Sequence, residues 1–147
     1  MSDRLPSADY PEWRQLLNLG LQLMAQPTIL ARRELIVKTA ARLLGGRGEL
    51  WLAEPLPRLL ASEESTSLPA EPPSEVMRRA LDVQQPFRTG KDESRPTPAI
   101  AAPLVAHGTV LGVLQVERPG GPPFSDAELE LLQGLTTQSA IALQSAR

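Results

Sequence analysis

Apolar side chains recur every three or four residues in two stretches near the start of the chain, a spacing typical of helices with one buried face. The first stretch begins at Asp9 with capping-box spacing and ends before Pro27. The second is predicted over 29–44 and ends at Gly45-Gly46. The first helix is too apolar to stand alone, so it needs a surface to pack on.

The pattern then changes to the short apolar runs of strands, with a long proline-rich interruption. A strand is predicted over 49–53. The segment 54–98 holds 8 of the 15 prolines, so we interpret it as loops lying over the sheet. One helix is expected inside it over 74–84, and Phe87-Arg88 is expected to add a short strand.

The last third of the chain predicts a β-hairpin followed by a long helix. Two apolar runs, 99–106 and 110–117, flank a His-Gly turn. After a break rich in glycine and proline, Ser125 can cap a helix while Glu128 reaches back to it. This order of elements indicates an α+β sandwich, with a central antiparallel sheet, the N- and C-terminal helices on one face, and loops with a short helix on the other.

The length of 147 residues suits one domain with a hydrophobic core of its own. We divide the chain into a short disordered lead, 1–8, and a single domain, 9–147. Within that domain the segment 54–98 is expected to cover a pocket on the sheet. No run of residues is apolar enough to cross a bilayer, and no secretion signal opens the chain, so we expect a cytoplasmic module without membrane insertion.

The hairpin and the helix after it resemble the C-terminal half of a GAF domain. The resemblance is carried by Ala101-Ala102-Pro103-Leu104, His107-Gly108, Leu111-Gly112-Val113-Leu114-Gln115-Val116, Phe124-Ser125, Leu131-Leu132 and Gln138-Ser139-Ala140-Ile141-Ala142-Leu143. GAF domains are small sensory modules of histidine kinases, cyclic-dinucleotide enzymes, phosphodiesterases and phytochromes. The resemblance therefore implies a regulatory domain of a bacterial signalling protein, linked to an output domain.

The resemblance also implies a site, because GAF domains bind small ligands on the sheet face opposite the terminal helices. We expect the pocket to be lined by residues of the first strand, the covering segment and the hairpin, namely Trp51, Met77, Leu81, Phe87, Ala102 and Leu104. The alternative is that these side chains are ordinary core. The eight residues before the hairpin are fewer than often carry a lid helix in ligand-binding members.

The composition removes several kinds of chemistry. The chain has no cysteine, which excludes disulfides, thiolate metal sites and thiol catalysis, and with them the sulfoxide reduction and bilin attachment of some GAF proteins. The only histidine, His107, falls at the turn, so neither a metal site nor a cofactor is implied. The net charge of −2 is spread along the chain, and the pairs Arg32-Arg33 and Arg78-Arg79 are interpreted as solvated faces, so nucleic acid is not an expected partner.

The terminal helices carry more apolar surface than a single contact with a sheet requires. We expect a homodimer in which they form a four-helix bundle. The expected interface residues are Trp13, Leu16, Leu17, Gly20, Leu132, Leu135, Ser139 and Leu143. The alternative is a monomer in which the first helix covers the last.

Three functions follow from the sequence. The first is a non-catalytic sensor that binds an unidentified small ligand or partner and relays this through dimeric terminal helices. The second is a structural dimerisation module whose pocket is filled by its own side chains. The third, an enzyme, requires a cleft that brings His107 beside a serine or a carboxylate.

Overall fold

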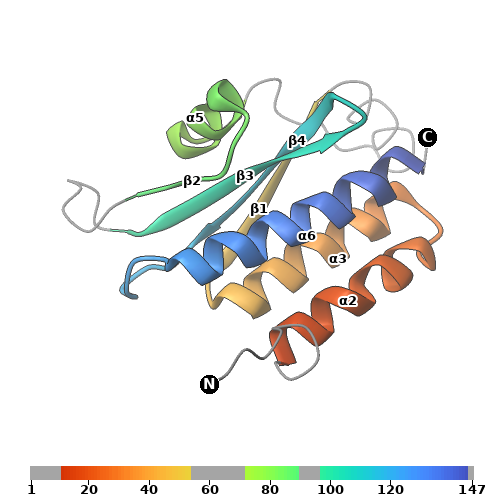
Figure 1. The fold of residues 1–147 in the computed structure, drawn as a ribbon, viewed down its shortest axis with the longest axis horizontal. Helices are drawn as coiled ribbons and strands as arrows, with labels where there is room; N and C mark the ends of the chain where they lie inside the picture. Colours follow the sequence, from red (N-terminus) through yellow and green to blue (C-terminus); the bar gives the residue numbers. More distant parts are fainter. Residues whose placement is uncertain (1–10, 54–71, 90–96, 146–147) are drawn as a thin grey trace, which may run out of the picture.

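In the residues that the structure describes, a four-stranded antiparallel sheet lies between three helices on one face and one helix on the other (Figure 1). The structure is a computed structural model that describes residues 11–53, 72–89 and 97–145. The sheet has the order β1-β4-β3-β2, formed by β1 (Arg47–Leu52), β4 (Thr109–Glu117), β3 (Ala99–Ala106) and β2 (Phe87–Arg88). The helices are α2 (Pro11–Met24), α3 (Ile29–Leu44), α5 (Glu75–Val83) and α6 (Asp126–Ser145). The predicted α+β sandwich is confirmed.

The ends of α3 follow local signals in the sequence. Thr28 caps its start, where the side-chain oxygen accepts a hydrogen bond from the backbone N–H of Ala31 at 3.0 Å. Gly45 ends it in the left-handed conformation, with φ of 67°, and donates its backbone N–H to the carbonyl of Ala41. The predicted lead, 1–8, and most of the proline-rich segment lie outside the described residues.

The central hairpin of β3 and β4 is built on a tight turn. His107 and Gly108 both have positive φ, 53° and 76°, as a type I′ turn requires, and this turn matches the twist of paired strands. The strands pair antiparallel from Ala99 opposite Glu117 to the turn, with one irregularity between Leu104 and Val105. The predicted hairpin is confirmed.

The start of α6 is fixed by a capping box and by an arginine. The backbone N–H of Ser125 donates to the Glu128 carboxylate at 2.8 Å, and the N–H of Glu128 donates to the Ser125 hydroxyl at 3.1 Å. Arg118, just after β4, also donates to this carboxylate and to the carbonyl of Leu44 at 2.7 Å. Its guanidinium lies over the Phe124 ring, 4.0 Å from the ring centre. Arg118 thus joins the end of α3 to the beginning of α6.

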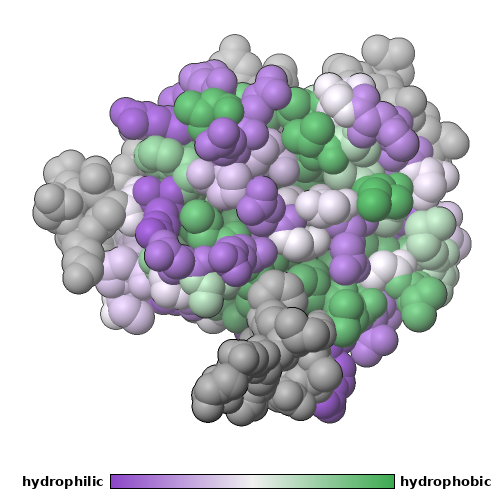
Figure 2. Space-filling view, in the orientation of Figure 1, coloured by the Kyte–Doolittle hydropathy of each residue, from purple (hydrophilic) through white to green (hydrophobic). Residues whose placement is uncertain are grey.

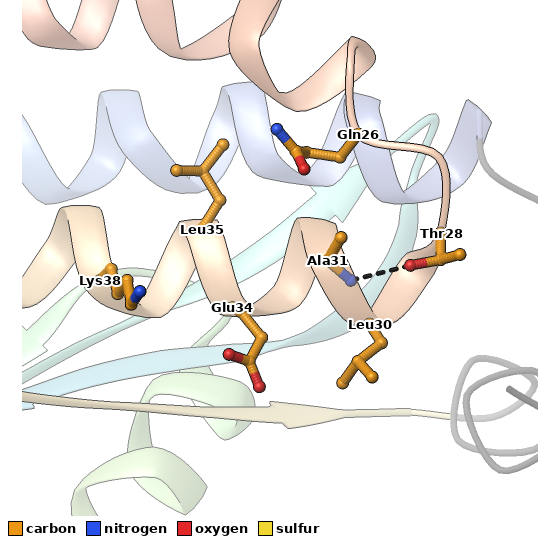
Figure 3. Close-up of a pocket in the computed structure, with 7 residues that line it drawn as sticks. All are labelled: Gln26, Thr28, Leu30, Ala31, Glu34, Leu35 and Lys38. Atoms are coloured by element: carbon orange, nitrogen blue, oxygen red, sulfur yellow. Dashed lines mark hydrogen bonds between the residues drawn. The ribbon is translucent and has the colours of Figure 1, made fainter. Parts of the chain in front are cut away.

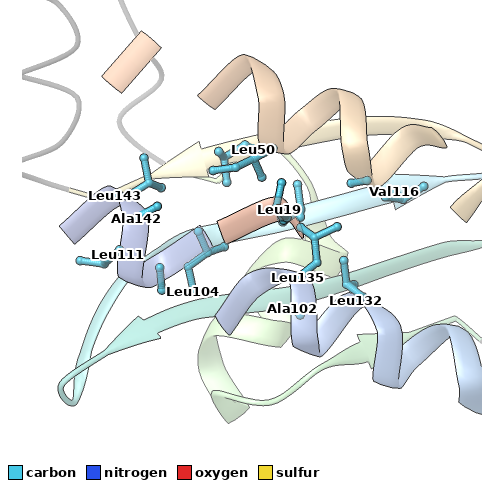
Figure 4. Packing of buried hydrophobic residues seen from close by; sticks show 14 of the residues in the cluster. Leu19, Leu50, Ala102, Leu104, Leu111, Val116, Leu132, Leu135, Ala142 and Leu143 are labelled. Atoms are coloured by element: carbon cyan, nitrogen blue, oxygen red, sulfur yellow. The ribbon is translucent and has the colours of Figure 1, made fainter. Parts of the chain in front are cut away.

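The main core fills the space between the sheet and the helices α3 and α6 (Figure 4). Leu50 of β1, Leu104 of β3 and Leu135 of α6 belong to this cluster and are almost completely buried. Helix α2 packs on α6 and α3 from outside and contributes the buried Leu19. Burial of each such leucine contributes about 1.5–3 kcal/mol, so this cluster is the main source of stability.

Glu128 makes the stability of this corner depend on pH. Burial raises the pKa of its carboxyl, but the hydrogen bonds from Arg118 and Ser125 and the charge of Arg118 lower it more, so the pKa lies below its ordinary value of 4.5. A carboxyl whose pKa is lowered by folding stabilises the folded state above its unfolded pKa. This contribution is lost as the pH falls through the lower folded value.

We expect Glu128→Gln to lower the free energy of unfolding by about 1–2 kcal/mol at pH 7, because the charge-assisted bond with Arg118 is lost. The difference from the wild type should shrink as the pH falls below about 4.5. Urea denaturation between pH 3 and pH 7 measures it. Glu130→Gln, on an exposed site of the same helix, is the matched control and should change little. A difference between wild type and Glu128→Gln that is independent of pH would contradict the assignment.

Candidate functional site

The sheet presents one set of side chains to α5, and we call this side the α5 face. Strand residues alternate between the two faces, and the register places Glu49, Gln115, Ala101 and Phe87 in one row across all four strands. Even-numbered neighbours such as Leu50 point to the opposite side, into the main core. The α5 face is the face on which the sequence predicts a pocket.

Helix α5 is packed tightly against the middle of this face. Its side chains Val76, Met77 and Ala80 are at most 1% exposed. They lie on Ala101 of β3 and Val113 of β4 in a second hydrophobic cluster. In the described residues, therefore, the space directly beneath α5 is filled by the chain's own side chains.

Four of the six predicted lining residues do lie on the α5 face, but at different places. Met77 is fully buried beneath α5, and Leu81 is partly buried beside it. Trp51 stands on β1 and Phe87 on β2, at opposite edges of the sheet. Three strand spacings separate these edges, roughly 14 Å. Among the described residues, the four therefore lie at separate places around one hydrophobic cluster: within it, beside it and at the two edges of the sheet.

The prediction was wrong for Ala102 and Leu104. Both are completely buried in the main core beneath α6, on the opposite face of the sheet (Figure 4). The hairpin pattern predicts the strand correctly, but β3 is covered on both faces and is apolar almost throughout, so hydrophobicity alone does not reveal which residues face α5. The neighbours Ala99 and Ala101 occupy the α5 face instead.

A chain of polar groups crosses the α5 face beside the start of α5. The Ser74 hydroxyl caps α5 by accepting from the N–H of Met77 at 3.0 Å, and it donates to the side-chain carbonyl of Gln115 at 2.5 Å. The Gln115 amide donates to the Glu49 carboxylate at 3.5 Å. Gln115 is only 2% exposed. Sequence reasoning missed this cluster, although a glutamine within an otherwise apolar strand was a signal for it.

On the same face of the sheet, Trp51 has a polar group that pairs with none of the described residues. Its side chain is partly buried, and its indole N–H is buried without a hydrogen-bond partner among the described residues. Trp51 follows Glu49 by two residues on β1, so both side chains are on the α5 face. An unpaired buried N–H costs about 1–3 kcal/mol, which a hydrogen-bond acceptor would relieve.

No catalytic or metal constellation appears in the parts of the chain that the structure describes. His107 is exposed at the hairpin turn. Nowhere in the described ranges do three histidine, aspartate or glutamate side chains come together as metal ligands would. None of the helices in these ranges combines the length and apolar character needed to cross a membrane.

A shallow hollow of about 510 Å³ lies on the helix side, where α2 connects to α3 (Figure 3). Leu30, Ala31 and Leu35 of α3 form its apolar part, while Glu34 and Lys38 are charged; the polar Gln26 and Thr28 complete the lining. The sequence did not predict this hollow. It is separate from the α5 face, because the sheet lies between α3 and α5.

Most of the expected dimer interface is buried inside one copy of the chain, so this prediction was wrong for those residues. Leu132, Leu135, Ser139 and Leu143 are completely buried, and Leu16 is 3% exposed. Helix α2 packs on α6 at Gly134, where the lack of a side chain leaves space for Leu16. A Cβ on Gly134 would lie only 2.8 Å from the Leu16 side chain. The alternative, that the first helix covers the last, is what the structure has.

Other apolar residues of the same helices remain on the surface. Leu17, Leu21 and Met24 of α2 and Ile141 of α6 are all more than half exposed, and we call them the exposed stripe. Hydrophobic surface over α2 is visible in the space-filling view (Figure 2). Gly20 is half-buried next to Gln138 of α6, and the Trp13 side chain lies outside the described residues.

The chain matches the family model of the GAF domain over residues 31–143. This match covers most of the chain, and the chain therefore belongs to the GAF domain family, as its hairpin and last helix predict. GAF domains are in general sensory and regulatory modules, and the chain is therefore a member of this class of domains.

Solved structures agree on the fold. The GAF domain of the potassium sensor histidine kinase KdpD from Escherichia coli is 17% identical, with a TM-score of 0.63, covering 90% of this chain and 92% of that one. The GAF domain of a phosphoenolpyruvate-protein phosphotransferase from Coxiella burnetii is 13% identical, with a TM-score of 0.69 and coverages of 92% and 94%. The free methionine-R-sulfoxide reductase from Neisseria meningitidis is 15% identical, with a TM-score of 0.71 and coverages of 100% and 95%.

Ser74 should matter more than an ordinary helix cap, because it also holds Gln115. We expect Ser74→Ala to lower the free energy of unfolding by about 1 kcal/mol for the cap and by a further 0.5–1.5 kcal/mol, roughly, for the bond to Gln115. Thr28→Ala removes only a cap and is the matched control. Chemical denaturation measures both losses. Equal losses, or additivity of Ser74→Ala with Gln115→Leu, would contradict the coupling.

Proposed function

We propose that this GAF domain is a non-catalytic sensor that binds a small ligand or a partner on the α5 face, at the edge formed by β1. The observation that carries the proposal is the indole N–H of Trp51, which has no partner among the described residues. Trp51 follows Glu49 by two residues on the same face of β1, and the Glu49 carboxylate accepts from the buried amide of Gln115. These groups offer both a donor and an acceptor to a ligand next to an aromatic ring. Such a mixture is typical of small-molecule sites.

A route from the α5 face to α6 supports the relay. Arg88 of β2 donates to the backbone carbonyl of Phe124 at 3.0 Å and pairs with Asp126 in the first turn of α6. The preceding residue, Phe87, lies under the guanidinium of Arg79 of α5, 5.6 Å from the ring centre. A shift of α5 therefore acts on β2 and, through Arg88, on the start of α6. A coupling free energy of about 1–3 kcal/mol is enough to bias an attached output domain.

A second copy of the chain is our proposed partner for the exposed stripe. Its four large apolar residues lie on neighbouring helices, and α2 presents Leu17, Leu21 and Met24 at helical spacing along one side. Symmetric contact between two such stripes would form a bundle from α2 and α6 of both copies. This proposal replaces the buried part of the predicted interface and retains Leu17.

The alternative function, a structural dimerisation module, is favoured by the tight packing of Met77 and Ala80 on the sheet. In that case the dimer would form and no ligand would bind. We propose the cytoplasm as the compartment, and an output domain, attached or separate, as the receiver of the signal. The even charge balance gives no support for nucleic acid as a partner.

Ligand binding at Trp51 is tested by thermal unfolding against a panel of small metabolites. A bound compound at 100 times its dissociation constant should stabilise the fold by about 2.7 kcal/mol. Trp51→Phe keeps the ring and removes the N–H, so it should reduce this stabilisation. Trp13→Phe, in α2 on the other side of the sheet, should not. A panel without any shift would favour the structural module, and a shift unaffected by Trp51→Phe would contradict the proposed site.

Dimerisation is tested by sedimentation of the wild type and of Leu21→Glu. Leu21 is 76% exposed, so a charge there should leave the fold intact and break a contact between two apolar stripes. We expect the wild type to sediment as a dimer and Leu21→Glu as a monomer. Val83→Glu places the same charge on an exposed residue of α5 and should leave the dimer unchanged. A wild type that is monomeric at high concentration would disprove this interface.

A further inference from the structure

Arg32 is a buried cation, whereas the sequence pattern predicted a solvated one. Arg32 lies in the first turn of α3 and is only 8% exposed. Its position was a signal, since Arg32 follows Ile29 by three residues and precedes Ile36 by four, and both are buried. It therefore lies on the inward stripe of the helix, and the correction follows from that spacing.

The partners of Arg32 are oxygens at the ends of two other helices. Nη1 donates to the backbone carbonyl of Ala142 at 2.6 Å and to the Ser145 hydroxyl at 3.3 Å, both in the last turn of α6. Nη2 donates to the carbonyl of Met24, the last residue of α2, at 3.4 Å. Nε donates to the carbonyl of Gln26 at 3.1 Å. In the described parts of the chain no carboxylate takes part in this network.

The packing of α2 and α6 explains why a cation is needed at this place. The two helices run side by side in the same direction, since Leu16 meets Gly134 and Met24 meets Ser145 (Figure 1). Their C-terminal ends are therefore neighbours, and each carries a partial negative charge and carbonyls without partners in its own helix. The positive charge of Arg32 is unfavourable in the first turn of α3, where the helix dipole is also positive. It is favourable next to the negative C-terminal ends of α2 and α6.

We infer that Arg32 is a positioning residue that clamps the last turn of α6 to the connection between α2 and α3. The planar guanidinium is suited to this because its nitrogens bind both helix ends at once, which a lysine ammonium does not do over the same span. As a result, the last turn of α6 follows any displacement of the α2–α3 connection. This clamp acts at the C-terminal end of α6, whereas Arg88 and Arg118 contact its N-terminal end.

The clamp also orders one end of the exposed stripe. Met24 has its sulfur 3.4 Å from the Ser145 hydroxyl and 3.9 Å from Nη1 of Arg32. Ile141 lies one turn before Ser145 on α6. Loss of Arg32 should therefore weaken the proposed dimer without changing any residue of its surface. This second consequence rests on the proposed function, whereas the clamp itself does not.

Hydrogen exchange of the whole chain, followed by mass spectrometry, tests the clamp. In Arg32→Met we expect roughly tenfold faster exchange in the last turns of α2 and α6, the effect of losing a hydrogen bond to a charged group. The hairpin of β3 and β4 should keep its protection. Arg33→Met, a half-buried neighbour on the same turn, is the matched control and should exchange like the wild type.

Arg32→Lys provides the second variant and keeps the test decisive if Arg32→Met does not fold. Its single nitrogen should protect one helix end and leave the other fast. Wild-type exchange at both ends in either variant would overturn the clamp, and so would an equal acceleration throughout the hairpin. Sedimentation separates the two proposals: faster exchange in Arg32→Met with a monomeric wild type supports the clamp and rejects the dimer.

Discussion

The helix layer is organised by the fact that α6 contacts two partners. One side of α6 covers the sheet with Leu132 and Leu135, and a neighbouring side, narrowed by Gly134, receives α2. A larger side chain at Gly134 would collide with Leu16, so the close approach of the two helices depends on it. Because α2 buries one of its sides against α6, the described apolar residues of α2 that stay exposed are those of the exposed stripe. The arrangement therefore determines both what is buried and what is left for a partner.

Arginines resolve the electrostatic consequences of this packing. Placing α2 and α6 side by side brings two negative helix ends together, and Arg32 from α3 lies between them. At the opposite end of the helix layer, Arg118 has the same role for the C-terminal end of α3. It donates to the carbonyl of Leu44 and also to the carboxylate of Glu128. In each case one guanidinium, with several donors in a fixed plane, satisfies groups from separate elements. Neighbouring elements are thus tied at both ends of the helix layer.

The sequence predicted the elements well because their signals are local. The turn at His107-Gly108 and the pairing of Ser125 with Glu128 are each settled by a few adjacent residues. Faces and partners were predicted less well, because they depend on contacts between distant segments. The apolar arc of α6 is the same whether α2 or a second copy covers it. Likewise, Leu104 and Ala101 are equally apolar, and only the register assigns them to opposite sides.

A structural change on one face of the sheet is not easily passed through the sheet to the other face. Strands β3 and β4 are buried on both sides and paired along their length, so a change on the α5 face must pass around an edge. At the β2 edge, the strand has only two residues, which pair with Ala101 and Ile100 of β3, and Thr89 after it bonds to Ala99. Arg88 joins this short strand to the start of α6. The shortest strand of the sheet therefore carries a direct link from the α5 face to the helix layer.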